Sequence, residues 1–343
     1  MIYARLAAFL LLPWLSVVTF AQQDAAPSQL DNGQIRLDVV VTPKSGPPVA
    51  GLQQQDFTLL DNKVPQTVTS FQAMSGSTAP VEIILLIDAV NTSYQTIAYE
   101  RSQIDKFLRA NGGKLAHPTT LAIFGDTGTQ LQNSFSTDGN AIADSLDKQT
   151  VALRTIHRSA GFYGAVERFD LSLKTLEQLS EVGATFHGRK LILWISPGWP
   201  FLSGPGVQTD ARQQQGIFNA IVTISTRLRE ARVTLYNINP LGAAESQNVF
   251  YYQEFLKGVS RSSQVSDGNL SLQVIATQTG GLVLNSSNDV TALLQQAFAD
   301  ADAWYELSFD QVRSEPNEYH HLEVRLSKPG LVARTRQGYY TQP

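Results

Sequence analysis

The stretch VEIILLIDAVNTSYQTIAYERSQIDKFLRAN, residues 81–111, changes from one periodicity to another within a few residues. Residues 81–87 are almost continuously apolar, which is typical of a central strand buried on both faces of a sheet. The run stops at Asp88, passes through a short polar loop and continues with Ile97 and Ile104 at helical spacing. A doubly buried strand that leads directly into a helix predicts an α/β protein with a mainly parallel sheet.

The same alternation of strands and helices continues as far as Ala303. Further strands are predicted at 119–126, 129–136, 189–198, 233–240 and 281–286, and helices at 139–148, 163–182, 210–232, 271–280 and 289–303. Thr127 and Gly128 form a tight turn between the first two of these strands, so we expect that pair to be an antiparallel hairpin. Helices on both faces of the sheet make a doubly wound domain, which we predict for residues 79–302.

Short strands of a different style flank this domain at both ends. They are predicted at 35–43, 56–61 and 66–74 in the N-terminal part, and at 304–310, 320–327 and 331–340 in the C-terminal part. Neither set is large enough to bury a two-sided core alone, because isolated hairpins are marginal in water. We therefore expect residues 34–78 and 303–343 to pair with each other into one small β unit.

The N-terminal segment MIYARLAAFLLLPWLSVVTFAQQ has the order of a secretory signal, with an early arginine, an apolar stretch and small residues before its end. Thr19 and Ala21 fit a cleavage site, which predicts a signal peptide at 1–21 and a flexible polar linker at 22–33. An uncleaved anchor is the alternative, since the apolar stretch is long. No later stretch has the pattern of a transmembrane segment, so we expect an exported chain, either periplasmic or secreted.

Composition narrows the class of protein. With 343 residues, of which 43% are hydrophobic and 16% charged, the chain can bury a substantial core and is expected to be globular. A formal net charge of −4 without basic runs argues against nucleic acid as a partner. The chain has no cysteine, so an exported form would depend on its core rather than on disulfides.

The strand order, the aspartate that closes the first buried strand and the hairpin after the first helix resemble the von Willebrand factor type A fold. The lead-in DFTLLDN (56–62) and the terminal stretch HHLEVRLSKPGLVARTRQGYY (320–340) are similar to those of the VWFA-related family of acidobacteria. The resemblance covers roughly residues 34–340. It implies a doubly wound sheet of the type A kind and a role in binding another protein.

Many type A domains carry a metal-ion-dependent adhesion site, and the resemblance implies where its ligands would lie. The family pattern is Asp-x-Ser-x-Ser after the first strand, a threonine on a second loop and an aspartate after the fourth strand, whose oxygens hold Mg²⁺ and leave a position for the partner. Asp88 matches the first ligand, but Val90 and Thr92 replace the serines, Ser159 stands for the threonine and Ser196 for the second aspartate. These changes predict a degenerate site without a resident cofactor, with weak Mg²⁺ or Mn²⁺ binding at Asp88 at most.

A shifted ligand set is the alternative if the loop is one residue longer than usual. Asn91 and Ser93 would then present oxygens beside Asp88, and Asp126 at the end of a neighbouring strand could face the same edge of the sheet. A structural role competes with both arrangements, in which Asp88 caps the following helix and accepts hydrogen bonds from loop amides.

A loop framed by proline and glycine, SPGWPFLSGPG (196–206), carries Trp199 and Phe201 at the C-terminal end of a predicted parallel strand. Open α/β sheets bind ligands at this edge. We expect the two rings to contact a protein partner, unless they tuck under the loop.

Other catalytic patterns are absent from the sequence, which has no nucleophile elbow, no phosphate loop and no zinc-protease motif. His320 and His321 are adjacent in a predicted strand, so their side chains would point to opposite faces and could not chelate one ion together. The sequence therefore predicts an exported, non-enzymatic module for protein–protein interaction. A metal-dependent adhesion domain that uses the shifted ligand set and a hydrolase that acts at the same sheet edge are the alternatives.

Overall fold

A mainly parallel sheet of seven strands forms the centre of the fold, in the order β11-β10-β9-β5-β6-β7, with β8 paired to β6. Its strands are β5 (Val81–Asp88), β6 (Lys114–Gly125), β7 (Gly128–Leu131), β8 (Ser136–Asp138), β9 (Arg189–Ile195), β10 (Val233–Ile238) and β11 (Val283–Leu284). Strands β7 and β8 are antiparallel to β6, and the remaining neighbours are parallel. The chain leaves β5 toward β6 and later returns to its other side at β9, so a topological switch point lies between β5 and β9.

The structure is a computed structural model. It describes residues 33–76, 79–132, 134–149, 161–186, 188–199, 209–242 and 251–342. The predicted signal peptide at 1–21 lies outside these ranges, as does the predicted linker except for Gly33. Within them, no helix combines the length and the apolar character that crossing a membrane requires.

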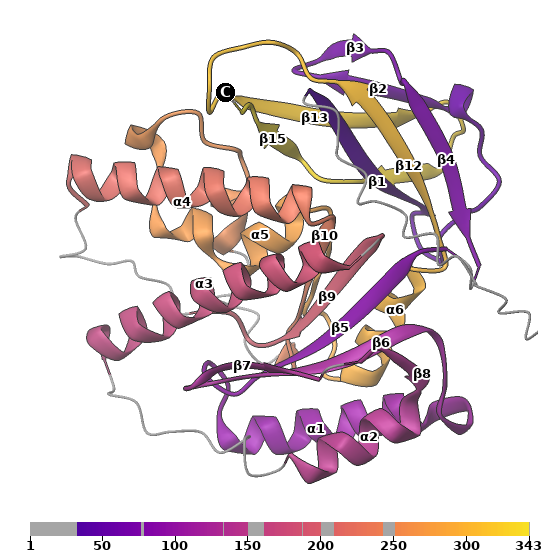
Figure 1. The fold of residues 1–343 in the computed structure, drawn as a ribbon, viewed down its shortest axis with the longest axis vertical. Helices are drawn as coiled ribbons and strands as arrows, with labels where there is room; N and C mark the ends of the chain where they lie inside the picture. The colour runs from indigo at the N-terminus through magenta and orange to yellow at the C-terminus, as the bar shows by residue number, and fades with distance from the viewer. Residues whose placement is uncertain are drawn as a thin grey trace, which may run out of the picture. The chain divides into compact units, whose positions relative to one another are not determined.

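Helices cover both faces of the sheet, as expected for a doubly wound domain (Figure 1). One layer holds α1 (Tyr94–Arg109), α2 (Gly139–Lys148) and α6 (Val290–Ala299), and the other holds α3 (Phe162–Thr185), α4 (Ala211–Glu230) and α5 (Leu272–Gln278). Alternation along β5 divides its side chains between the layers, since Ile83, Leu85 and Ile87 join the first core and Ile84 and Leu86 the second. Short 3₁₀ turns are η1 (Gln54–Asp56), η2 (Ala110–Gly113), η4 (Tyr251–Phe255), η5 (Ser262–Gln264) and η6 (Asp267–Leu270).

The two ends of the chain build a β sandwich together. Its strands are β1 (Gln34–Pro43), β2 (Phe57–Asp61), β3 (Val64–Gln66), β4 (Ser70–Ser75), β12 (Ala303–Asp310), β13 (Tyr319–Leu326), β14 (Leu331–Arg334) and β15 (Gly338–Tyr340). One sheet has the order β14-β1-β12-β4 and the other β15-β13-β2-β3, so both sheets mix N-terminal and C-terminal strands. A shared apolar core that includes Leu37, Leu59, Leu307 and Leu322 fills the space between them. The predicted joint β unit is confirmed.

Two segments that were each predicted as one strand are divided between the sheets. The segment 66–74 contains the end of β3, paired with β2, and most of β4, paired with β12. The segment 331–340 contains β14, paired with β1, and β15, paired with β13. Between β14 and β15 the chain forms hydrogen bonds outside the ladders of these two strands. Thr335 Oγ1 donates to the carbonyl of Asp38, and the amide of Gln337 donates to the carbonyl of Gln278. The periodicity of a strand does not reveal such a crossing between sheets.

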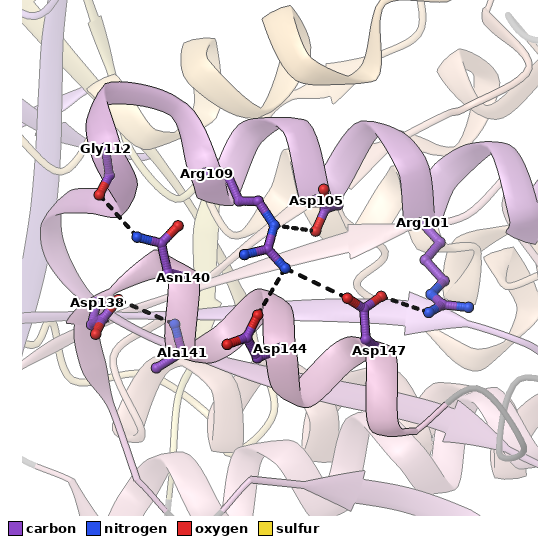
Figure 2. A network of polar contacts seen from close by, with 9 residues as sticks. All are labelled: Arg101, Asp105, Arg109, Gly112, Asp138, Asn140, Ala141, Asp144 and Asp147. Carbon is purple, nitrogen blue, oxygen red and sulfur yellow. Dashed lines mark hydrogen bonds and ion pairs between the residues drawn. The ribbon is translucent and has the colours of Figure 1, made fainter.

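Helices α1 and α2 are joined by exposed ion pairs on their outer surface (Figure 2). Arg109 on α1 lies 2.8 Å from Asp105 and 2.9 Å from Asp144, and Arg101 lies 2.7 Å from Asp147. Such pairs contribute little to stability in water. We therefore attribute the packing of α1 and α2 chiefly to their buried apolar side chains.

Leu307→Ala tests the joint β unit. Leu307 is fully buried in β12 and lies opposite Leu37 of β1 and Phe71 of β4. Its truncation should lower the free energy of unfolding of the unit by about 2–5 kcal/mol, because it leaves a cavity in the shared core. Hydrogen exchange should show β1 and β4 losing protection together with β12.

The matched control is Val332→Ala on β14, where the side chain is half exposed and the effect should stay within about 0.5 kcal/mol. Full protection of β1 and β4 in the Leu307 variant, alongside loss of protection in β12, would contradict a jointly folded unit.

Candidate functional site

Asp88 lies at the C-terminal end of β5, beside the switch point, and its side chain is fully buried. Its Oδ1 accepts hydrogen bonds from the backbone amides of Val90 at 3.0 Å and Asn91 at 2.8 Å. Its Oδ2 accepts from Asn91 Nδ2 at 2.9 Å, Trp194 Nε1 at 3.0 Å and Ser196 Oγ at 2.9 Å. We call these five residues the Asp88 cluster.

Neighbouring elements hold the donors in place. Trp194 and Ser196 are two residues apart at the end of β9, so both side chains project to the face of the sheet that Asp88 shares. Ser196 is fixed further, because its amide donates to the carbonyl of Ile238 and its Oγ accepts from the amide of Gly198. Asn91 Nδ2 also reaches Ser172 Oγ on α3 at 3.0 Å, which ties the β5–α1 loop to that helix.

The Asp88 cluster does not fit an adhesion-type metal ion. A carboxylate offers about four lone-pair positions. The carboxylate of Asp88 already accepts hydrogen bonds from five protein donors. Val90 has no side-chain oxygen, and the buried Thr92 hydroxyl has no hydrogen-bond partner among the described residues. Ser159 lies outside the described ranges. In the parts of the chain that the structure describes, no group of three His, Asp or Glu side chains could hold an ion.

The residues of the shifted ligand set make other contacts in the structure. Asn91 presents its amide nitrogen to the carboxylate, so it acts as a donor. Ser93 is the N-cap of α1, and its Oγ accepts from the amide of Thr96 at 3.3 Å. Asp126 lies in the turn between β6 and β7. Binding of an ion by this set of residues stays a prediction.

The predicted capping role of Asp88 is wrong in part. An N-cap side chain must reach the amide three residues later, and Ser93 does so at the start of α1. Asp88 lies farther upstream and instead accepts from the amides of Val90 and Asn91, as aspartate does when it closes a turn. Its predicted hydrogen bonds to loop amides are confirmed.

Trp199 is not an exposed contact residue, contrary to our prediction. Only 6% of its surface is exposed, and its ring packs against Trp194 at 5.2 Å and Phe169 at 6.5 Å between centroids. Packing of this large ring against two other aromatic rings outweighs its exposure to a partner. Phe201 lies outside the described residues.

The two adjacent histidines point to opposite faces of β13, as predicted. His320 is buried, with Nδ1 2.8 Å from Asp61 Oδ1 and Nε2 3.0 Å from Ser314 Oγ, whereas His321 is exposed. The His320 ring also stacks on Tyr339, whose hydroxyl donates to Asp61 Oδ2 at 2.8 Å. These contacts join β13, β2 and β15 inside the β sandwich and give His320 a structural role.

Glu100 on α1 is a buried carboxyl that the sequence analysis missed. It is fully buried, and among the described residues neither of its carboxyl oxygens has a hydrogen-bond partner. Burial raises its pKa well above the ordinary value, and the nearby charge of Asp88 raises it further. The helical spacing of the sequence indicates this burial, because Glu100 lies three residues after Ile97 and four before Ile104, on the apolar face of the helix.

The two buried carboxyls differ in their hydrogen bonds. Burial also raises the pKa of Asp88, but hydrogen bonds from Asn91, Trp194 and Ser196 lower it and favour the charged form. Glu100 has no such bonds. The pKa of Asp88 is therefore raised less than that of Glu100, so Asp88 ionises at a lower pH than Glu100.

Comparison with known proteins gave matches to solved structures only. No protein-family model and no curated protein matches the sequence. The pilus adhesin SpaC from Lactobacillus rhamnosus GG is 9% identical with a TM-score of 0.40, over 86% of this chain and 49% of SpaC. The SpRpn10 VWA domain is 11% identical with a TM-score of 0.32, over 65% of this chain and 98% of that domain. The human COPII-coat protein Sec24c is 11% identical with a TM-score of 0.34, over 79% of this chain and 44% of Sec24c.

This chain thus spans about half the length of SpaC and less than half that of Sec24c. We assign the von Willebrand factor type A fold from the strand order, the two helix layers and the β6–β7 hairpin of the chain itself. Membership of the VWFA-related family of acidobacteria stays a prediction.

Asp88→Ala should lower the free energy of unfolding by about 3 kcal/mol or more, because two buried and three half-buried donors lose their acceptor and each buried unsatisfied group costs about 1–3 kcal/mol before relaxation. The control Ser93→Ala removes only the cap of α1 and should cost about 0.5–2 kcal/mol. Urea unfolding measures both. Equal losses near 1 kcal/mol would show that Asp88 is no more than a local turn residue.

Glu100→Gln should make stability less dependent on pH. The raised pKa means that folded Glu100 keeps its proton above the pH at which the unfolded chain releases it, so stability falls as pH rises from about 4.5 toward the folded pKa. The amide cannot titrate, and the variant should therefore gain stability relative to the natural protein between pH 5 and pH 8.

The control is Glu181→Gln, which removes an exposed carboxyl on α3 and should leave that pH dependence unchanged. A constant difference between the Glu100 variant and the natural protein across this pH range would mean that Glu100 is ionised in the folded state.

Proposed function

We propose that this chain is an exported, non-enzymatic module that binds another protein through the C-terminal edge of its type A sheet, without a metal ion. One observation carries the proposal. At this edge Asp88 is closed off by internal donors, while large aromatic side chains on the adjoining helix starts are exposed to solvent.

The exposed aromatic residues lie at the beginnings of two helices. Tyr94 starts α1 with 63% of its surface exposed, and Phe162 and Tyr163 start α3 with 52% and 84% exposed. The two helices cover opposite faces of the sheet, but both begin at its C-terminal edge, to the left in Figure 1. Tyrosine and phenylalanine are enriched in protein interfaces, where they supply large contact areas at a small entropic cost. These residues are better candidates for partner contact than the buried Trp199.

Two features support a binding role without metal or catalysis. The carboxylate that would hold an adhesion-type ion is fully used by protein donors, so a partner's acidic group has no ion to reach. The buried histidine of the β sandwich is engaged with Asp61 and Ser314 and lies in β13, away from the β5 edge. The predicted signal peptide supports export.

A photo-crosslinking amino acid in place of Tyr163, in cells that make the protein naturally, tests the proposal. We expect one defined protein adduct that survives EDTA, and none from the same probe at Val332, an exposed position on β14. Tyr94→Ser or Phe162→Ser should reduce the adduct roughly 5- to 30-fold, as expected for an interface residue worth about 1–2 kcal/mol.

Other outcomes would favour the alternatives. An adduct that needs Mg²⁺ or Mn²⁺ and disappears in Asp88→Ala would favour a metal-dependent adhesion domain. Turnover of a substrate, lost on substitution at the same edge, would favour a hydrolase. Equal labelling from Tyr163 and Val332 would remove the sheet edge as the binding surface.

A further inference from the structure

A second buried cluster lies where the β sandwich meets the central sheet. Four arginines and Asp38 line a cavity of about 20 Å³: Arg36 and Asp38 on β1, Arg229 near the end of α4, Arg232 before β10, and Arg336 between β14 and β15. We call it the arginine cavity. Its walls come from both ends of the chain and from the sheet domain, so it belongs to the junction that holds the two parts together.

Two carboxylates neutralise only part of this charge. Arg232 Nη2 donates to Asp38 Oδ1 and to Glu306 Oε2, each at 2.6 Å. Arg36 Nε lies 3.1 Å from the other oxygen of Glu306. These contacts engage Asp38 and Glu306 with Arg232 and Arg36, and they leave the charges of Arg229 and Arg336 to be balanced by other groups.

Arg229 and Arg336 have little compensation. Among the described residues, the ion pair of Arg229 is with Glu230, at 3.3 Å between Nη2 and Oε1. The Glu230 carboxyl is about half exposed. Arg336 is 7% exposed and forms no ion pair with a carboxylate of the described residues. Burial and the neighbouring charge of Arg229 lower the pKa of Arg336 to about 9, although the charge of Asp38 acts in the opposite direction.

Hydrogen-bond donors are also in excess. Among the described residues, the Nε groups of Arg229 and Arg232 are buried and have no hydrogen-bond partner, whereas Arg36 Nε has Glu306 at 3.1 Å. A buried donor without an acceptor is costly, and buried charges in proteins are normally paired. Asp38 is the carboxylate among the lining residues and is already engaged by Arg232, so the remaining guanidinium groups face a shortage of negatively charged acceptors.

We propose that the arginine cavity binds one small monovalent anion of halide size, with chloride as the physiological ion. A volume of about 20 Å³ exceeds the roughly 10–15 Å³ that one water needs, and it is too small for a nucleotide or a peptide. The ion accepts from the buried guanidinium groups and balances the charges of Arg229 and Arg336. Because it contacts residues of both parts, it links the β sandwich to the sheet.

Thermal unfolding of the full chain at constant ionic strength tests the proposal, with sodium chloride replacing sodium gluconate stepwise. An anion that binds only the folded state raises the melting temperature by mass action, so we expect a saturable rise of about 2 °C or more. Bromide should reproduce the rise. Identical melting curves in chloride and gluconate would overturn the proposal.

A matched pair of variants separates this site from general salt effects. Arg336→Gln should abolish the chloride-dependent rise, while Arg325→Gln, at an exposed arginine paired with Glu323, should retain it. Arg229→Gln replaces the first variant if that one does not fold. An unchanged chloride response in the cavity variants would refute the site.

Crystals of the natural protein grown in sodium bromide give a direct readout that needs no variant. Anomalous scattering should show one bromide between Arg229 and Arg336. Density for water alone in the cavity, or bromide only on the surface, would contradict the proposal even if chloride raised the melting temperature.

Discussion

Antiparallel pairing of β1 with β12 is the constraint on which the rest of the structure depends. It brings Gln34–Val39 against Tyr305–Asp310, and so closes a loop that contains the whole sheet domain. Closing such a loop costs conformational entropy, and the apolar core shared by the two sheets offsets that cost. Because β12 follows α6 closely, the same strand also anchors the sandwich to the sheet domain. Trp304 at its start packs in the sheet's core, beneath the guanidinium of Arg189 at 5.3 Å.

The edge of the sheet that could hold a ligand is organised by a different interaction. An aspartate at the end of a central strand can either leave oxygens open to an ion or use them for internal bonds. This chain uses them internally, and the two donors from β9 lock the switch point between β5 and β9. In the proposed binding mode, recognition at this edge depends on exposed side chains such as Tyr94 and Tyr163.

Periodicity was sufficient to predict the main helices and strands of the sheet domain, the β6–β7 hairpin and the joint β unit, because each depends on local pattern or on the number of strands. The partners of Asp88 could not be predicted in the same way. Trp194 reads as one apolar residue in a buried strand, and its role as a donor depends on the register of β9 against β5. Trp199 illustrates the same limit, since loop composition does not show which way a ring turns.

The two buried charge clusters differ in how they can become neutral. In the Asp88 cluster, donors are sufficient for one carboxylate, and the neighbouring Glu100 avoids a second charge by keeping its proton. A guanidinium has no comparable route at neutral pH, because even the lowered pKa of Arg336, about 9, leaves it mostly charged. The surplus in the arginine cavity must therefore be balanced by an anion from outside the chain. Since the walls of that cavity belong to both parts of the fold, the ion becomes one of the contacts that hold them together.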